Sequence, residues 1–382
     1  MQLEFLEAHH FRNLGGKVHW GDGLNVLVGD NGQGKTNWLE AIYLLATTKS
    51  FRTQRPQESM CFGENLSVVR GRVRRTSEIQ RDLQVTLQAN TKTLTVNEKR
   101  VSIAGYLGQL HVVAFTADEL EVVRGGPDAR RRFLDRGVIP LHHSYVQTLT
   151  DYQRVLKQKN RLLQDLSESE TPPGRAQEML APWNEQLISL SASIHEARND
   201  YVGRLQEHLE RRLFGQEEVT IRYVSSLEGK GDLSDYEGLI RERLRLRALA
   251  EIAAGYSLIG PHRDELEILF DGRDIRTFGS SGQQRSALIL LDLAAISVYY
   301  SAHREYPLFL LDDVDAELDK KRISDLLGFL EGQTQTFITT SKENLIKDFP
   351  VGAEVFKITG GAVAETSAFT PEATIATAAE GI

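Results

Sequence analysis

The sequence contains a single cysteine, Cys61, among 382 residues, which excludes an internal disulfide. This composition fits a reducing compartment and predicts a cytoplasmic protein. No apolar stretch is long enough to cross a membrane, because the longest, residues 287–300, is interrupted by Asp292 and is shorter than roughly 20 residues. The first twenty residues lack a basic start followed by an apolar segment, so we predict no secretory signal and no membrane partner.

A positive net charge is also missing. The formal net charge is −8, which argues against non-specific adhesion of the whole chain to nucleic acid. Any DNA contact must therefore come from local basic clusters, and three are present, at residues 70–75, 130–132 and 241–247. A content of 41% hydrophobic and 26% charged residues is typical of a soluble globular protein.

The chain divides into segments of different periodicity. Residues 1–120 contain short apolar runs that predict strands at 24–28, 67–73, 83–87 and 111–115, with a helix at 38–47. Residues 121–250 carry leucines at helical spacing, interrupted by TPPGR at 171–175, which predicts a helical hairpin or a small helical lobe. An ordinary bundle fits as well as a coiled coil, because neither arm sustains several strict heptads.

Strand signals return in residues 251–365, at 266–270, 307–313, 335–340 and 354–359. The prediction is an α/β lobe that is built from both ends of the chain, with the helices inserted between them. Residues 366–382 are rich in threonine and alanine and are expected to form a loose tail.

The stretch GDNGQGKT, at 29–36, matches the phosphate-loop pattern G-x-x-x-x-G-K-[ST] and lies between a predicted strand and a predicted helix. Its glycines allow successive backbone N–H groups to face one anion at the start of the helix. The residues expected to hold the phosphates of ATP are Gly29, Asn31, Gly32, Gln33, Gly34, Lys35 and Thr36. Lys35 would reach the β and γ phosphates, and Thr36 would place its hydroxyl on Mg²⁺.

A magnesium site also needs an acidic group at the end of a buried strand. Asp312 and Asp313 directly follow the apolar run 308–311. Because the carboxyl ends of parallel strands meet at one edge of a sheet, Asp312 is expected to hold Mg²⁺ and Asp313 to face the γ-phosphate. The predicted catalytic residues are Lys35, Asp312 and Asp313.

A second glycine turn, SSGQQ at 280–284, precedes an apolar helix at 287–300. Ser280, Gly282 and Gln283 offer a hydroxyl, a close backbone approach and a helix N-terminus, which together suit an anion. The turn resembles the signature loop of ABC-type ATPases, which closes on the γ-phosphate bound by the opposite protomer. A plain helix cap is the alternative.

Four further stretches carry a wider resemblance: FRNL at 11–14, GGPDARRRFLD at 125–135, GPHRDEL at 260–266, and the signature turn followed by LLDDVDAELD. Together they resemble the RecF family of bacterial recombinational-repair ATPases, which is related to the SMC proteins. The match runs in order along the chain and ends at about residue 365. It is specific, because transporter ATPases share the phosphate loop and signature but not the other stretches.

The resemblance implies an α/β fold with an ABC-type ATPase head and an inserted helical arm. It implies ATP and Mg²⁺ as cofactors, ATP-dependent homodimerisation, and binding of DNA at gaps or junctions of single and double strands. It further implies help in loading RecA, indirectly, through RecR and RecO. By the same resemblance, Arg12 and Asn13 lie near the nucleotide.

The sequence departs from the related ATPases at two positions. They usually place glutamate where Asp313 stands, and a histidine after the strand that reads FITTSK here, where Thr340 or Ser341 is found instead. RecF-like chains also carry the aspartate pair. The resemblance therefore implies slow ATP hydrolysis, which suits a timed switch.

The basic clusters leave alternatives open. Arg70, Arg72 and Arg74 fall on one face of a predicted strand, where they can contact DNA phosphates or form a solvated edge. Arg130 and Arg131 can contact DNA or tie the two lobes together. The arginines at 241–247 also fit a plain polar helix face.

Three histidines suggest no chemistry of their own. His142 and His143 are adjacent and diverge on any regular element, so we predict no zinc site. For His262, a hydrogen-bonded structural role is favoured over contact with the nucleotide or signalling between the lobes. Two other functions remain open: an ABC-type ATPase subunit of another system, and a scaffold that holds ATP without turnover. Measuring phosphate release with and without gapped DNA distinguishes the scaffold from the ATPases, because the scaffold releases no phosphate under either condition.

Overall fold

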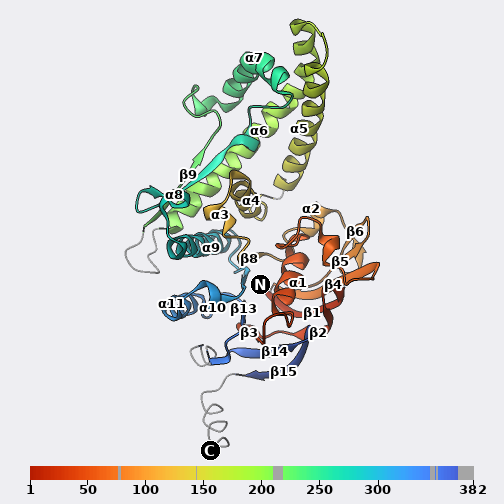
Figure 1. The fold of residues 1–382 in the computed structure, drawn as a ribbon, viewed down its shortest axis with the longest axis vertical. Coiled ribbons are helices and arrows are strands. Elements are labelled where there is room, and N and C mark those ends of the chain that lie inside the picture. Colours follow the sequence, from red (N-terminus) through yellow and green to blue (C-terminus); the bar gives the residue numbers. More distant parts are fainter. Residues whose placement is uncertain (76–78, 143, 210–217, 345–348, 350–351, 369–382) are drawn as a thin grey trace, which may run out of the picture.

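The computed structural model describes residues 1–75, 79–142, 144–209, 218–344, 349 and 352–368 (Figure 1). Its strands are β1 (Gln2–Phe11), β2 (Leu14–His19), β3 (Leu24–Val28), β4 (Leu66–Arg74), β5 (Gln80–Gln88), β6 (Lys92–Val96), β7 (Lys99–Arg100), β8 (Val112–Phe115), β9 (Val219–Val224), β10 (Glu265–Phe270), β11 (Arg273–Asp274), β12 (Leu308–Leu311), β13 (Thr336–Thr340), β14 (Glu354–Thr359) and β15 (Ala362–Ala368). Its α-helices are α1 (Lys35–Thr47), α2 (Ile103–Tyr106), α3 (Glu121–Arg124), α4 (Pro127–Val138), α5 (Tyr145–Ser167), α6 (Pro173–Leu209), α7 (Tyr236–Ala254), α8 (Ile275–Phe278), α9 (Ser281–His303), α10 (Val314–Glu317) and α11 (Lys320–Leu330).

A mainly parallel sheet forms the centre of the lower half of the molecule in Figure 1, with strand order β15-β14-β3-β13-β12-β8. Strands β3 and β8 come from the N-terminal part of the chain, and the others come from the C-terminal part. Their parallel register places the ends of β3 and β12 at the same edge, with β13 between them. The structure thus confirms that this lobe is built from both ends of the chain.

A second sheet, with strand order β2-β1-β4-β5-β6-β7, is antiparallel and lies beside the first. Helix α1 packs between the two sheets, which explains why it is apolar on nearly all sides. Trp38, Leu39 and Ile42 of α1 are fully buried in this core. The helix that follows the phosphate loop is therefore held rigidly by both sheets.

The arm is made by α5, α6 and α7, which extend upward from the head in Figure 1. Helices α5 and α6 form the predicted hairpin, and α6 continues through Pro182 without ending. Strand β10, at the predicted run 266–270, pairs with β9 and β11 in a small third sheet instead of joining the parallel sheet. The sequence pattern cannot distinguish these pairings, because both leave the apolar face of β10 buried.

Helix α9 connects the arm to the head and is long and apolar enough to cross a bilayer. However, 67% of its most apolar window is buried against the rest of the protein, as in a core helix. Strand β15 extends three residues into the segment that we expect to be a tail. The rest of that segment, 369–382, lies outside the described residues, as does His143.

Candidate functional site: a nucleotide-binding edge

The phosphate loop follows β3 and opens α1, as predicted. Gly34, with φ 102°, caps the helix in the left-handed region, where a side chain would be strained. The Lys35 ammonium is buried and donates to the carbonyl oxygens of Gly29, at 2.7 Å, and Asp30, at 2.9 Å. The lysine thus lies across its own loop, where it can exchange these carbonyls for phosphate oxygens.

The other loop residues divide into an exposed lip and an anchored stem. Asn31 and Gly32 are exposed at the lip. Gln33 accepts hydrogen bonds from the backbone N–H groups of Gly360 and Gly361, both at 2.7 Å, through its side chain and its carbonyl respectively. The turn between β14 and β15 therefore holds the stem, and leaves the lip open to a ligand.

The acidic partner lies where the sheet topology places it. Asp312, directly after β12, accepts hydrogen bonds from the hydroxyls of Thr36, at 2.8 Å, and Thr339, at 2.7 Å. Burial raises the pKa of the Asp312 carboxyl, and these two hydrogen bonds oppose that shift. Asp313 adopts a left-handed φ of 53° and donates its backbone N–H to the Thr339 hydroxyl at 2.7 Å.

This donor set fits Mg²⁺. A hydroxyl and a carboxylate oxygen already meet at the carboxyl edge of the sheet, and hard cations prefer oxygen ligands. Thr36 and Asp312 would hold the ion, whose chemistry is to neutralise charge on the phosphates. Thr339 is a member of this group that sequence reasoning missed. Its position at the end of the strand between β3 and β12 was the available signal, but the strand order is not visible in the sequence.

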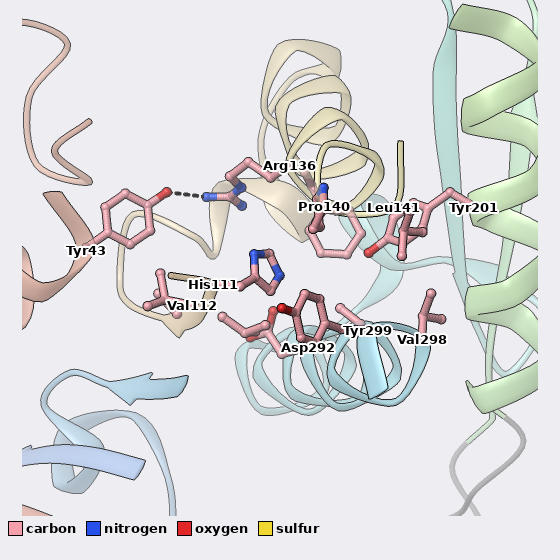
Figure 2. A pocket seen from close by; sticks show the side chains of 15 residues that line it. Tyr43, His111, Val112, Arg136, Pro140, Leu141, Tyr201, Asp292, Val298 and Tyr299 are labelled. Atoms are coloured by element: carbon pink, nitrogen blue, oxygen red, sulfur yellow. Dashed lines mark hydrogen bonds between the residues drawn. The ribbon is translucent and has the colours of Figure 1, made fainter. Parts of the chain in front are cut away.

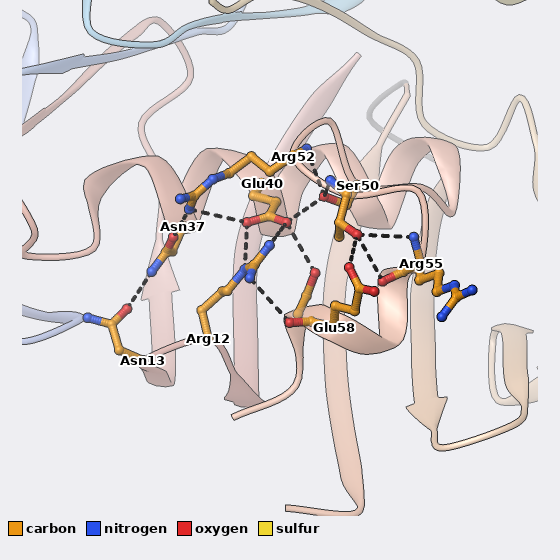
Figure 3. A network of polar contacts seen from close by, with 10 residues as sticks. Arg12, Asn13, Asn37, Glu40, Ser50, Arg52, Arg55 and Glu58 are labelled. Carbon is orange, nitrogen blue, oxygen red and sulfur yellow. Dashed lines mark hydrogen bonds and ion pairs between the residues drawn. The ribbon is translucent and has the colours of Figure 1, made fainter. Parts of the chain in front are cut away.

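Arg12 and Asn13, which the family resemblance places near the nucleotide, contact residues of α1, the helix that the phosphate loop opens (Figure 3). The Asn13 side chain lies against Gly34, where an added Cβ would come within 2.8 Å of its oxygen. The Arg12 guanidinium forms a bidentate pair with the carboxylate of Glu40, at 3.0 and 2.8 Å. Glu40 was not predicted. An acid inside an apolar helical run was the signal for a buried partner.

The position of the missing histidine is occupied by a hydroxyl cluster. Thr340 donates to a carboxylate oxygen of Asp315 at 2.7 Å, and Ser341 donates to the other oxygen at 3.2 Å. These hydrogen bonds tie the end of β13 to α10, which directly follows Asp313. Neither hydroxyl can replace a histidine as a proton carrier at neutral pH.

The signature turn forms a capping box at the start of α9. The Ser280 hydroxyl accepts from the Gln283 N–H at 3.3 Å, and the Gln283 side chain accepts from the Ser280 N–H at 2.9 Å. The carbonyl of Gly282 accepts from Arg322 at 3.4 Å. Ser280 is exposed, and α8, which precedes it, lies on the other side of Figure 1 from α1. The capping box is what the alternative of a plain helix cap predicts. It also leaves an exposed helix N-terminus that can receive an anion.

The arginines predicted to contact DNA are all engaged in ion pairs. Arg70 pairs with Glu7, Arg72 with Asp82, and Arg74 with Glu4 and Asp22, along the outer face of β4. Arg130 is only 6% exposed and forms a bidentate pair with Glu265, at 2.6 and 2.7 Å. Arg131 donates to the carbonyl of Asp264 and pairs with Asp128. For Arg130 and Arg131 these contacts favour the alternative that they tie the lobes together.

Other polar residues hold the arm in place. His262 contacts the hydroxyl of Tyr152 at 2.6 Å and the carbonyl of Ser257 at 3.2 Å. Burial lowers the pKa of His262 to about 4, so the ring is neutral. Within the described residues, no group of three or more His, Cys, Asp and Glu side chains could hold a metal ion.

A small cavity lies where the head, α4 and α9 meet (Figure 2). Its volume of about 40 Å³ has room for ordered water but not for a nucleotide. Arg136 spans this junction by donating to the hydroxyl of Tyr43, on α1, at 2.8 Å. Asp292 of α9 is buried here, and burial raises the pKa of its carboxyl well above the usual value. The cavity belongs to the contact between head and arm.

The fold and this edge define a class of protein: a phosphate-loop ATPase head of the ABC type, with a helical arm inserted into it. Residues 2–363 match the family described as the RecF/RecN/SMC N terminal domain. Among curated relatives, the DNA replication and repair protein RecF of Bacillus mycoides is 37% identical, with 95% of this chain and 97% of the relative covered. The RecF of Oceanobacillus iheyensis is 34% identical, with 95% of this chain and all of the relative covered.

Solved structures agree. The chain superposes with a TM-score of 0.86 and 30% identity on a structure titled as the recombination mediator protein RecF-ATP in the RecFOR pathway, over 96% of this chain and 97% of that one. An SMC head bound to the winged-helix domain of ScpA shares the fold, with a TM-score of 0.52 and 15% identity. The chain belongs to the RecF family of DNA replication and repair proteins.

Proposed function

We propose that this protein is a weak ATPase that binds ATP and Mg²⁺ at the edge formed by Lys35, Thr36 and Asp312. ATP joins two copies of the chain, because the signature turn of each copy contacts the triphosphate held by the other. Hydrolysis then separates the copies. Asp313 in place of glutamate, together with the absent histidine, makes hydrolysis slow.

The ATP-bound dimer binds DNA at gaps or at junctions between single and double strands, in the cytoplasm and without a membrane partner. It acts in recombinational repair with RecR and RecO, and through them it aids the loading of RecA. The titles of the similar structures, which name the RecFOR pathway and ATP, support this proposal. Arg70, Arg72 and Arg74 of β4 each pair with a carboxylate in the free protein, and because exposed pairs of this kind are weak, their contact with DNA phosphates stays part of the proposal.

The single observation that carries the proposal is the hydrogen bond from Thr36 to Asp312, at 2.8 Å across 276 residues of sequence. It brings the phosphate loop and the acidic strand end together in the arrangement that a Mg²⁺-nucleotide requires. The same arrangement accounts for the buried lysine and for the glycine turn that precedes it.

The test is binding to gapped, single-stranded and fully paired DNA, with and without ATP and Mg²⁺, at several stated salt concentrations. We expect ATP to increase affinity for gapped DNA at least tenfold, with a smaller effect on single strands. Light scattering on the same samples should show twice the monomer mass with ATP. Equal DNA affinity with and without ATP, at unchanged mass, contradicts the clamp.

A further inference from the structure

The carboxylate of Glu40 is fully buried beside the phosphate loop and is the centre of a polar network (Figure 3). Besides the bidentate pair with Arg12, it accepts hydrogen bonds from the hydroxyls of Ser50, at 2.6 Å, and Ser59, at 3.1 Å. The Arg52 guanidinium lies 3.8 Å away. A buried carboxylate is costly unless paired, and these two cations and two hydroxyls provide the partners.

The position of Glu40 connects it to the nucleotide edge. It follows Thr36 by four residues on α1, so the two side chains lie on the same face of the helix. Arg52 donates to the Asn37 side chain at 2.9 Å, and Asn37 donates to Asn13 at 2.7 Å, beside Gly34. The polar contacts thus run from Glu40 through Arg52 and Asn37 to Asn13, whose side chain lies against Gly34 of the phosphate loop.

Both arginines are positioned by this carboxylate. Arg12 has a left-handed φ of 53°, a conformation that costs energy for a residue other than glycine and needs local support. Its side chain is 23% exposed, and that of Arg52 is 45% exposed. Arg52 is placed near the magnesium edge by its hydrogen bond to the side chain of Asn37, the residue that directly follows Thr36 on α1.

We propose that Glu40 is a positioning residue of the nucleotide site, whose buried charge holds Arg12 and Arg52 beside the phosphate loop so that they attract the triphosphate. This inference rests on the proposed ATP binding. Glu40 touches no phosphate itself. Its role is to hold the side chains of Arg12 and Arg52, which would otherwise extend into solvent, in a fixed position before ATP binds.

The experiment is calorimetric titration of the full chain with ATP and Mg²⁺, comparing the unmodified protein with Glu40→Gln, at a temperature where both are folded. We expect Glu40→Gln to bind ATP about tenfold more weakly, and Glu40→Asp, which keeps the charge, to recover part of the loss. A merely structural role would lower the melting temperature but leave the ATP affinity of the folded protein unchanged, and that result overturns the proposal.

A double-mutant cycle identifies the route of the effect. If Glu40 acts through Arg12, then Arg12→Gln and the double variant Arg12→Gln/Glu40→Gln should bind ATP with similar affinity. Fully additive losses would contradict this route. The matched control is Glu58→Gln, an exposed acid of the same network that contacts Arg12 only through its backbone carbonyl. It should keep the unmodified affinity.

Two results separate this inference from the proposed function. No ATP binding by the unmodified protein refutes the function itself, whereas equal binding by that protein and Glu40→Gln refutes only the role of Glu40. If Glu40→Gln does not fold, Arg52→Gln takes its place, because it removes only a half-exposed cation. Weaker ATP binding by Arg52→Gln supports the proposal, and unchanged binding overturns it.

Discussion

The phosphate loop and the signature turn are both glycine turns that open a helix, but the rest of the chain treats them differently. The phosphate loop is tied to Asp312 through Thr36, and to the β14–β15 turn through Gln33, by hydrogen bonds that cross hundreds of residues. The signature turn is exposed and is capped by its own residues, Ser280 and Gln283. The fold therefore assembles the phosphate-loop half of the proposed site within one chain, whereas the signature-turn half lies exposed at the surface.

The largest effect on ATP affinity should come from a change in the phosphate loop. Lys35→Met removes the ammonium that lies across the loop, so we expect ATP affinity to fall at least about 100-fold, equivalent to about 2.7 kcal/mol. Calorimetric titration measures this loss. Circular dichroism of the same variant controls for folding, and retained affinity would remove the basis of the phosphate-loop assignment.

A change in the signature turn should affect only the ATP-dependent dimerisation. Ser280→Arg places a bulky cation on the exposed turn, and we expect it to abolish the ATP-dependent dimer while ATP affinity stays within about twofold, below about 0.4 kcal/mol. Light scattering with ATP and Mg²⁺ measures the dimer. Ser189→Arg, on an exposed face of α6, is the matched control. Loss of ATP binding in Ser280→Arg would mean that the turn serves its own phosphate loop.

Two arginine ion pairs offer a similar contrast, because that of Arg130 is largely buried and that of Arg72 is exposed. Arg130→Ala leaves Glu265 without its bidentate partner at the junction of head and arm, and should lower the free energy of unfolding by about 3 kcal/mol. Arg72→Ala breaks an exposed pair with Asp82 and should cost less than about 1 kcal/mol. Urea unfolding measures both. Equal costs would contradict the assignment of Arg130 as the tie between lobes.

The last prediction concerns pH. Burial lowers the pKa of His262 to about 4, so between about 6.5 and 4 the unfolded chain binds a proton that the folded protein does not. Stability is therefore lost as pH falls through this range, by at most about 3 kcal/mol. Because His262→Gln lacks this proton, its stability deficit relative to the unmodified protein should shrink on acidification. Urea unfolding at pH 7 and pH 5 measures the deficit, and a constant value would show that His262 does not titrate as described.

Much of the head could be predicted from local patterns. The phosphate loop, α1 and the apolar run before Asp312 each depend on neighbouring residues, whose spacing alone indicates a strand, a turn or a helix. The arm could be recognised as helical, although Pro182 lies inside α6, because packing along the hairpin outweighs one proline. Strand β10 was correctly expected, but its partner β9 was not, since pairing depends on residues far apart in sequence.

The sequence by itself determined that a glycine loop, a lysine and a strand-end aspartate are present, because these motifs are local. Only the tertiary structure decided which groups they meet. Thr339 reaches Asp312 because β13 lies between β3 and β12, and Glu40 meets Arg12 because α1 is enclosed by two sheets. The physical reason is that a buried polar group must find a partner, and the fold, through strand order and burial, determines which partner is within reach.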